Sequence, residues 1–397
     1  VKGFTVHQFP PDSESQVTLA NWRSAPFNRW AFHHVSELVP SAVIKNNPDH
    51  VSTVQTGSTI SLPDIELDGS VIKGETFLEA THTDGLVILA DGQQVYESFA
   101  NNMTLSDPHI LMSVSKSMLG LLVGILVEQG VLDLDATVES YLPELQNSGF
   151  AGATLQQLLD MRTAVVFDED YLATSGDIIE YRKATNWNPL EPGEQATDLR
   201  AFFATLDQSA GPHGGDFDYK SPCTDLLGWV IERASGQRYC DLFSQLLWSR
   251  IGAAYPGMIT VDRLGAPRVA GGMSITTHDL ARVGQMLVDD GAGIVPTAWI
   301  DDMESNGDPT AWDKGSFAEH FPGLPMHYRS KWYVLRGESP ILFCLGIHGQ
   351  YLFVDRKAKV VLAKHSSAPQ ALDPRAELMM IRMFEAVRSL VCAGVSS

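Results

Sequence analysis

Strand patterns occur at both ends of this 397-residue chain, and a long stretch with helical and loop patterns separates them. Residues 86–99 carry apolar strand patterns on either side of Asp91-Gly92, which is typical of a β-hairpin. Near the other end we expect three consecutive strands followed by a closing helix, over residues 341–347, 351–354, 360–364 and 374–391. The strands of one sheet therefore come from both ends of the chain.

This arrangement predicts an α/β fold with an antiparallel sheet flanked by N- and C-terminal helices, plus a mostly helical inserted domain. We assign residues 1–130 and 331–397 to the α/β domain and residues 131–330 to the helical domain. The active site is expected between the two. Within the first part, residues 118–127 are apolar nearly all round, which predicts a buried helix.

Composition narrows the function classes. With 48 acidic and 28 basic residues, the formal net charge is −20, which argues against nucleic acid or an anionic membrane as partner. The apolar run at 118–127 is too short to span a bilayer, and residues 1–17 lack a secretory pattern. The four cysteines form no metal-ligand spacing and are expected to be reduced, mostly buried thiols. These features favour a cytoplasmic protein and allow a homodimer.

Ser113-Val114-Ser115-Lys116 is a Ser-x-x-Lys motif, a pattern short enough to arise about once by chance. A second match, Ser70 to Lys73, lies in a β-branched segment between glycines, where positions i and i+3 of a strand face opposite sides. Ser113 instead precedes the buried helix, so its Oγ and the Lys116 Nζ share one face. We therefore expect Ser113 to be a nucleophile and Lys116 its base.

The start of a helix suits this chemistry. The Ser113 backbone N–H can stabilise an oxyanion, and the positive helix end disfavours a charged Lys116, which lowers the pKa of its amine. No metal or organic cofactor is implied, because the sequence has no HExxH motif, phosphate-binding loop or dinucleotide fingerprint.

Three segments in order carry a family resemblance: Met112 to Ser117, Phe217 to Pro222 with the following Thr224 to Trp229, and Leu345 to Gln350. Together they resemble the active-site motifs of the penicillin-recognising serine hydrolases, in particular the class C β-lactamases and related esterases. Within that family the chain most resembles the hydrolases of nylon oligomers, over most of its length. The fold implied is β-lactamase-like, and the activity implied is cleavage of carboxylic esters or short linear amides through an acyl-enzyme.

The resemblance also implies roles for individual residues. Tyr219 shares proton transfer with Lys116, whose charge lowers the phenol's pKa so that Tyr219 acts as base, and Ser221 holds Lys116 by a hydrogen bond. Ile347 supplies the second oxyanion N–H, and Tyr171 meets the leaving group. The substrate-binding group comprises Arg182, Trp187, Trp332, Tyr333, Ser221, Gly346 and His348, although ordinary core packing remains the alternative for the aromatic residues. We expect His348 to be structural rather than a partner of Ser113.

The sequence departs from the family pattern at two places that affect which substrates the protein is expected to accept. The family's Lys-Thr-Gly motif is replaced by Cys344-Leu345-Gly346, so the lysine that binds the carboxylate of a penicillin or peptide is missing. A free amine would need a carboxylate near Tyr171, but Arg182 aligns best with that position and would repel an ammonium group. Ester hydrolysis is therefore expected to be the main activity. The alternatives are a D-Ala-D-Ala peptidase or β-lactamase, and a non-catalytic binding protein on this fold.

Overall fold

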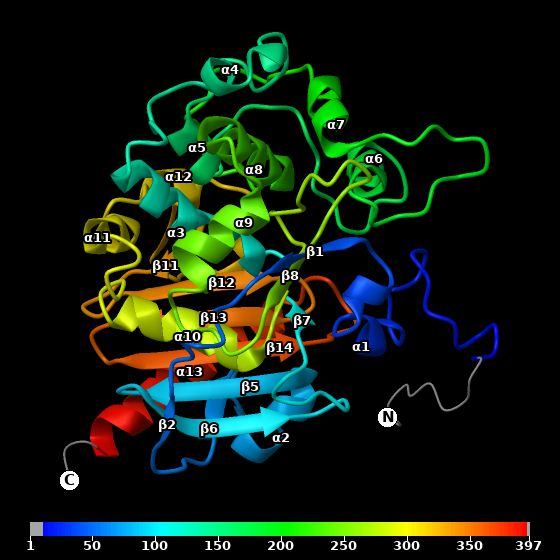
Figure 1. The fold of residues 1–397 in the computed structure, drawn as a ribbon. Helices are drawn as coiled ribbons and strands as arrows, with labels where there is room; N and C mark the ends of the chain where they lie inside the picture. Colours follow the sequence, from blue (N-terminus) through cyan, green and yellow to red (C-terminus); the bar gives the residue numbers. More distant parts are fainter. Residues whose placement is uncertain (1–10, 395–397) are drawn as a thin grey trace.

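An eight-stranded sheet forms the base of the computed structural model, which describes residues 11–394 (Figure 1). The strand order is β10-β11-β12-β13-β14-β5-β6-β2, and every neighbouring pair is antiparallel except β2 with β6. The strands are β2 (Gln55–Thr56), β5 (Thr83–Ala90), β6 (Gln93–Phe99), β10 (Met326–Arg329), β11 (Trp332–Leu335), β12 (Ile341–Gly346), β13 (Gln350–Asp355) and β14 (Val360–Ser366).

The pairing of β5 with β14 joins the two ends of the chain, as predicted. Leu89 lies opposite Val361, and both strands are buried along their whole length. The expected hairpin between β5 and β6 turns at Asp91 and Gly92, whose φ angles of 45° and 75° suit a tight turn between twisted strands. Because β5, β12, β13 and β14 are buried on both faces, helices must cover the sheet from each side.

Three long helices provide that cover: α3 (Val114–Glu128), α10 (Thr277–Val288) and α13 (Pro374–Gly394). On α10, a Cβ added at Gly284 would lie 2.4 Å from Val361 and 3.1 Å from Leu352, so this helix packs directly on β13 and β14. On α13, Phe384 stacks on Phe353 with ring centroids 5.2 Å apart. Since Leu352 and Phe353 are adjacent on one strand, α10 and α13 cover opposite faces of the sheet.

The remaining helices gather mainly above the sheet in Figure 1, around α8. A capping box formed by Thr154 and Gln157 is present at the start of α5. These helices and short helical turns are α1 (Asn28–Ala31), η1 (Val35–Glu37), α2 (Gly74–Ala80), α4 (Val138–Tyr141), η2 (Pro143–Leu145), α5 (Leu155–Leu159), α6 (Asp177–Ala184), α7 (Leu199–Thr205), α8 (Ser221–Ser235), α9 (Tyr239–Phe243), η3 (Ser244–Trp248), α11 (Thr297–Ser305), α12 (Pro309–Asp313) and η4 (Ala318–His320).

Two smaller sheets complete the fold. One has the antiparallel order β1-β8-β9-β7, and the other is the hairpin β3-β4. Ser70 lies on this hairpin, and Lys73 forms an ion pair with Asp64, so the second Ser-x-x-Lys match is a strand as predicted. The strands are β1 (Ser41–Ile44), β3 (Ile65–Leu67), β4 (Ser70–Ile72), β7 (His109–Ile110), β8 (Gly257–Thr260) and β9 (Met273–Ile275).

Several segments that the sequence analysis placed in the helical domain instead pack with the α/β part. Helix α10 covers β5, β13 and β14, and β10 is an edge strand of the main sheet. In the small sheet, β8 and β9 pair with β1 and β7, which come from the first 130 residues. Periodicity predicted the helical character of α10 but could not show which surface it covers, because that surface is far away in sequence.

Three of the four cysteines, Cys223, Cys240 and Cys344, are buried thiols as expected, whereas Cys392 is exposed. Within residues 11–394, no helix combines the length and the apolar character needed to cross a bilayer.

Candidate active site

Ser113 lies where a strained turn enters a buried helix. Met112, the residue before it, has a φ of 47°, a left-handed conformation that residues other than glycine seldom adopt. Ser113 is the N-cap residue of α3, and the helix behind it is buried from Val114 to Leu126. The turn therefore presents the Ser113 hydroxyl at the end of a firmly packed element.

Lys116 lies one turn further along α3 and contacts Ser113. Its Nζ is 2.9 Å from the Ser113 Oγ and 2.7 Å from the Ala270 carbonyl oxygen, and only 1% of the residue is exposed. Burial lowers the pKa of Lys116 to about 7, with Arg268 adding to the effect and Glu169 opposing it. A large fraction of this amine is therefore neutral near pH 7 and can accept the Ser113 proton.

Tyr219 completes a group of three with Ser113 and Lys116. The Lys116 Nζ lies 4.9 Å from the centre of the Tyr219 ring, and the phenol is hydrogen-bonded to the Ser113 hydroxyl. Burial and the Glu169 carboxylate raise the pKa of Tyr219, which reverses the predicted lowering by Lys116. The sequence analysis missed Glu169, whose negative charge opposes ionisation of the phenol. Tyr219 is thus neutral near pH 7 and able to donate a proton, whereas Lys116 is able to accept one.

The end of β12 approaches the turn before Ser113. A Cβ added at Gly346 would lie 2.5 Å from the Leu111 carbonyl oxygen and 3.1 Å from the Met112 Cβ, so only glycine allows this contact. Ile347 follows directly. Within residues 11–394, neither the Ile347 N–H nor the Ser113 N–H donates a backbone hydrogen bond. Two unused amides beside the nucleophile are what an oxyanion hole requires.

Ser221 does not hold Lys116. Its hydroxyl donates to Glu169 Oε1, and its backbone N–H donates to Glu169 Oε2 at 2.5 Å. The same carboxylate accepts the Tyr171 hydroxyl at 3.1 Å. Glu169 therefore orients Ser221 and Tyr171. The sequence analysis gave Glu169 no role, although it lies two residues before Tyr171.

The Ala270 carbonyl takes the role that the sequence analysis gave to Ser221. The Ala270 N–H donates to Asp225 Oδ1 at 2.7 Å, which anchors the residue whose carbonyl oxygen accepts the hydrogen bond from Lys116 Nζ. Asp225 is itself buried and forms an ion pair with Arg268, and it also accepts the Tyr181 hydroxyl. A buried hydrogen-bonded network of this kind holds its members in one arrangement, although the Arg268 Nε has no partner within residues 11–394.

A cavity of about 860 Å³ opens beside this group. Tyr171, Arg182, Ile347 and His348, four of the predicted site residues, line it together with Glu169. Arg182 is 8% exposed and donates from Nη2 to the Tyr171 carbonyl oxygen at 3.3 Å. Ser113, Lys116 and Tyr219 do not line this cavity, but Ile347 and Tyr171 do, so it lies next to the residues around Ser113 and offers space for part of a substrate.

His348 is structural, as expected. Burial lowers its pKa to about 4, so the imidazole is neutral near pH 7. Its Nδ1 is 2.8 Å from the Ala368 carbonyl oxygen, and its ring packs edge-on against Phe32. The ring contributes a wall to the cavity and has no contact with Ser113 that would make it a base.

The three predicted pocket aromatics lie outside the cavity lining. Trp332 is fully buried, and its indole N–H donates to the Ser117 carbonyl oxygen, which anchors α3. Tyr333 is 2% exposed and stacks on Phe343 within the core. Trp187 is 4% exposed and donates to the Thr260 hydroxyl at 3.1 Å. Aromatic residues serve cores and pockets equally well, so sequence alone could not separate the two uses.

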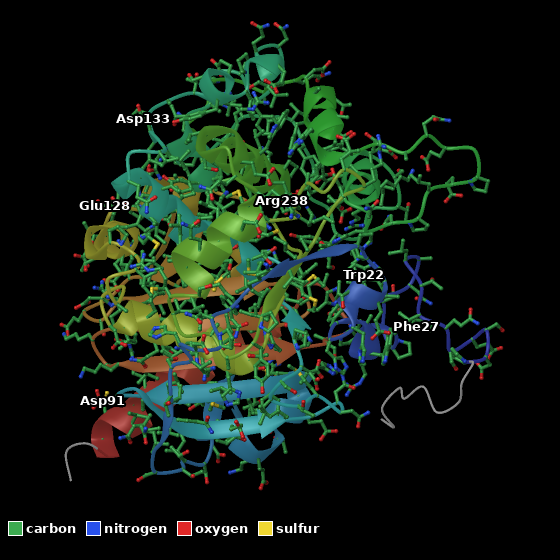
Figure 2. All side chains as sticks on the ribbon, in the orientation of Figure 1. Trp22, Phe27, Asp91, Glu128, Asp133 and Arg238 are labelled. Atoms are coloured by element: carbon green, nitrogen blue, oxygen red, sulfur yellow. The ribbon has the colours of Figure 1, made fainter. Side chains whose placement is uncertain are left out.

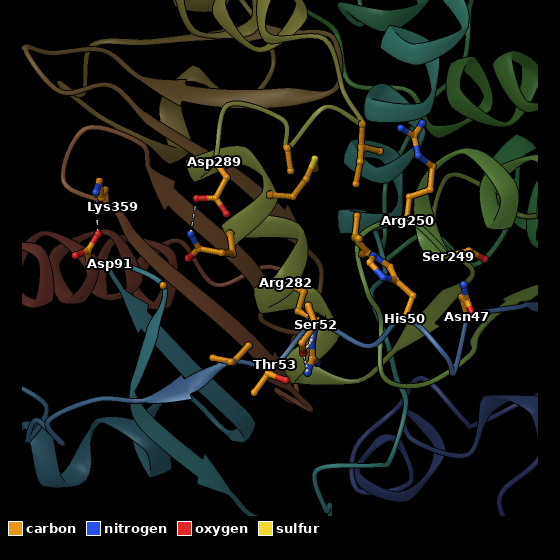
Figure 3. Close-up of a pocket in the computed structure, with 17 residues that line it drawn as sticks. Asn47, His50, Ser52, Thr53, Asp91, Ser249, Arg250, Arg282, Asp289 and Lys359 are labelled. Atoms are coloured by element: carbon orange, nitrogen blue, oxygen red, sulfur yellow. Dashed lines mark hydrogen bonds and ion pairs between the residues drawn. The ribbon is translucent and has the colours of Figure 1, made fainter.

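A second cavity, of about 930 Å³, lies elsewhere on the molecule and is drawn in Figure 3. None of the predicted catalytic residues lines it. Several of its charged side chains are engaged with protein groups: Lys359 pairs with Asp91 at 2.8 Å, and Arg282 donates to the Ser52 hydroxyl at 3.0 Å. No group of three or more His, Cys, Asp or Glu side chains in residues 11–394 is arranged to hold a metal ion.

Comparisons with known proteins show the family of this chain. The family model described as Beta-lactamase matches residues 75–381, which is most of the chain. The chain therefore belongs to the beta-lactamase family and is a serine hydrolase of that family.

Its relatives include a 6-aminohexanoate-dimer hydrolase from Paenarthrobacter ureafaciens, which is 33% identical over 369 residues and covers 91% of each chain. A solved structure from Bacillus anthracis, described as a candidate 6-aminohexanoate-dimer hydrolase, is 27% identical with a TM-score of 0.86, covering 95% of this chain and 97% of that one. EstCE1, a hydrolase with promiscuous acyltransferase activity, shares the fold at 18% identity and a TM-score of 0.61, over 79% of this chain and 98% of that one.

Proposed function

We propose that this protein hydrolyses carboxylic esters, and more slowly short linear amides, through an acyl-enzyme on Ser113. The observation that carries the proposal is the 2.9 Å contact between the Ser113 Oγ and the Nζ of Lys116, an amine whose pKa burial lowers to about 7. A free lysine would be almost entirely protonated at neutral pH and could not act as a base.

In the acylation step, Lys116 takes the Ser113 proton while the Ser113 Oγ forms a bond to the substrate carbonyl carbon. The N–H groups of Ser113 and Ile347 stabilise the negative oxygen of the tetrahedral intermediate. When the intermediate collapses, the bond to the leaving oxygen or nitrogen breaks. The Tyr219 phenol gives the leaving group a proton and recovers one from the Lys116 ammonium.

Deacylation repeats these transfers with water. Lys116 removes a proton from the water, the resulting hydroxide attacks the ester carbonyl, and the Ser113 oxygen regains its proton as the acid leaves. Tyr171 borders the cavity, where the family resemblance gives it contact with the leaving group. Its hydroxyl is oriented by Glu169 at 3.1 Å.

The relatives named 6-aminohexanoate-dimer hydrolase make linear amides a reasonable second substrate class. The cavity, however, carries Arg182 where a substrate ammonium group would need a carboxylate. We therefore expect the 6-aminohexanoate dimer to be a poor substrate. β-Lactams and D-Ala-D-Ala peptides are disfavoured, because buried Cys344 occupies the position where a lysine would grip their carboxylate.

The test is a substrate panel of p-nitrophenyl acyl esters, 6-aminohexanoate dimer and nitrocefin, run with the wild type and Ser113→Ala. We expect ester turnover and labelling by a fluorophosphonate probe, both abolished in Ser113→Ala. Dimer turnover as fast as short-ester turnover would refute the substrate preference. Labelling that survives in Ser113→Ala would refute the assignment of the nucleophile.

A further inference from the structure

Two arginines line the cavity beside Ile347 and Tyr171, and neither has a carboxylate partner. Arg182 comes from α6, and Arg23 comes from the N-terminal segment, directly after Trp22, which Figure 2 labels beside α1. Neither guanidinium forms a salt bridge with any acidic side chain of residues 11–394. Glu169 and Asp170 line the same cavity but lie beyond ion-pair distance of both arginines, and cations without a directly paired anion are costly to keep in a cavity unless an anion binds there.

The two guanidinium groups also have unused donors. A guanidinium has five N–H donors. Within residues 11–394, Arg23 donates one hydrogen bond, to the Asn188 side-chain oxygen, and its buried Nε has no partner. Arg182 donates one, to the Tyr171 carbonyl oxygen. Each group therefore has donors free for a ligand.

The positive charges of these side chains repel one another. Burial, with smaller contributions from the nearby Arg182 and Arg268, lowers the pKa of Arg23 to about 9. Burial and Arg268 also lower the pKa of Arg182, and the Glu169 and Asp170 carboxylates oppose this effect. Arg268 is neutralised by Asp225, with which it forms a buried ion pair, but Arg23 and Arg182 have no such partner. A bound anion would relieve this repulsion.

Two carboxylates also border the cavity, and both are engaged with other groups. Glu169 accepts hydrogen bonds from the Ser221 N–H, the Ser221 hydroxyl and the Tyr171 hydroxyl. Asp170 Oδ1 accepts the Leu172 N–H at 2.8 Å. His348 is neutral and bonded to a carbonyl oxygen. Apart from the exposed Asp170, the charged groups of the cavity wall with unused hydrogen-bonding capacity are therefore Arg23 and Arg182.

We infer that the natural substrate carries a carboxylate, which the cavity binds through the guanidinium groups of Arg23 and Arg182. The inference rests on the proposed function and adds the charge of the substrate to it. Guanidinium groups pair with carboxylates through two parallel hydrogen bonds, so two of them define both the position and the charge of the bound group. The carboxylate belongs to whichever part of the ester, acyl chain or leaving group, occupies the cavity.

Binding can be measured without turnover by isothermal titration calorimetry on Ser113→Ala, with hexanoate, hexanamide and hexylammonium as probes. We expect hexanoate to bind at least about 10-fold more tightly than the other two. Combining Arg23→Gln and Arg182→Gln should remove the difference, whereas Arg182→Lys should keep part of it. Equal affinity for all three probes, or a preference for hexylammonium, would overturn the inference.

Turnover shows which part of the substrate lies in the cavity. The acyl series compares p-nitrophenyl monoadipate, hexanoate and 6-aminohexanoate, and the leaving-group series compares the butyryl esters of 4-hydroxybenzoate and of its methyl ester. We expect kcat/KM to favour the anionic compound in one series by about 10-fold or more. Arg182→Asp should reverse the ranking of adipate and 6-aminohexanoate if the acyl chain occupies the cavity. Arg250→Gln, an arginine lining the cavity of Figure 3, is the matched control and should leave the ratio unchanged.

The outcomes separate the two proposals. If neutral esters are hydrolysed only when Ser113 is present and neither series favours the anion, the carboxylate site is refuted and the proposed function stands. If no ester is turned over, the proposed function fails, and the calorimetry with hexanoate still decides whether the cavity binds a carboxylate.

Discussion

The pKa of Lys116 makes the rate of nucleophile activation depend on pH in a defined way. An unperturbed lysine with a pKa of 10.5 would be neutral in only about one molecule in 3,000 at pH 7. With the pKa at about 7, half of the molecules carry the neutral amine. Burial of this one side chain therefore raises the population of the active base by roughly 1,000-fold.

We expect the plot of kcat/KM against pH to fall on its acid side, with the midpoint of this acid limb near pH 7. Below that pH the neutral fraction of Lys116 falls tenfold per unit, so kcat/KM at pH 5 should be about 50-fold lower than at pH 7. The assay is kcat/KM for p-nitrophenyl butyrate between pH 5 and 9. The second-order rate of fluorophosphonate labelling over the same range reports activation of Ser113 apart from deacylation.

Two variants should move the limb in opposite directions. Glu169 stabilises the charged form of Lys116, so Glu169→Gln should lower the pKa of Lys116 and shift the limb below pH 7. Lys331 is a nearby cation that disfavours the charged form, so Lys331→Met should raise the pKa and shift the limb upward. Limbs that stay in place in both variants, or move in the same direction, would refute the assignment of Lys116 as the base.

Two further predictions concern glycines at close contacts. Gly346→Ala places a Cβ 2.5 Å from the Leu111 carbonyl oxygen and should displace the Ile347 amide, which lowers kcat on neutral esters by roughly 100-fold or more; an unchanged kcat would contradict the role given to this amide. Gly124→Ala places a Cβ 2.5 Å from the Trp299 indole and should lower the free energy of unfolding by about 1–3 kcal/mol in urea denaturation; an unaltered denaturation midpoint would show that α3 can move away from Trp299.

Local patterns predicted much of the fold. The Asp91-Gly92 turn, the buried helix α3, the strands β12 to β14 and the helix α13 all lie where their residues indicated. The i, i+3 spacing also brought Lys116 within 2.9 Å of Ser113, because a helix places those two positions on one face. Each of these inferences used residues that are neighbours in sequence.

Predictions that depended on distant partners fared less well. The Ala270 carbonyl holds Lys116, whereas Ser221 turns to Glu169. Trp332 and Tyr333 were expected in the pocket and lie in the core. Helix α10 was assigned to the helical domain and covers the sheet. In each case the residue type and its local element were compatible with both arrangements.

What the sequence by itself determined is the set of local elements and the pairing of a serine with a lysine at a helix start. Hydrophobic period and turn chemistry specify those directly. Only the tertiary structure decided which groups surround that pair: the carboxylate that keeps Tyr219 protonated, the glycine that lets β12 approach Ser113, and the arginine that the N-terminal segment brings to the cavity beside Arg182. Burial and charge at the site depend on which side chains are close in space, and many of those side chains are far apart along the chain.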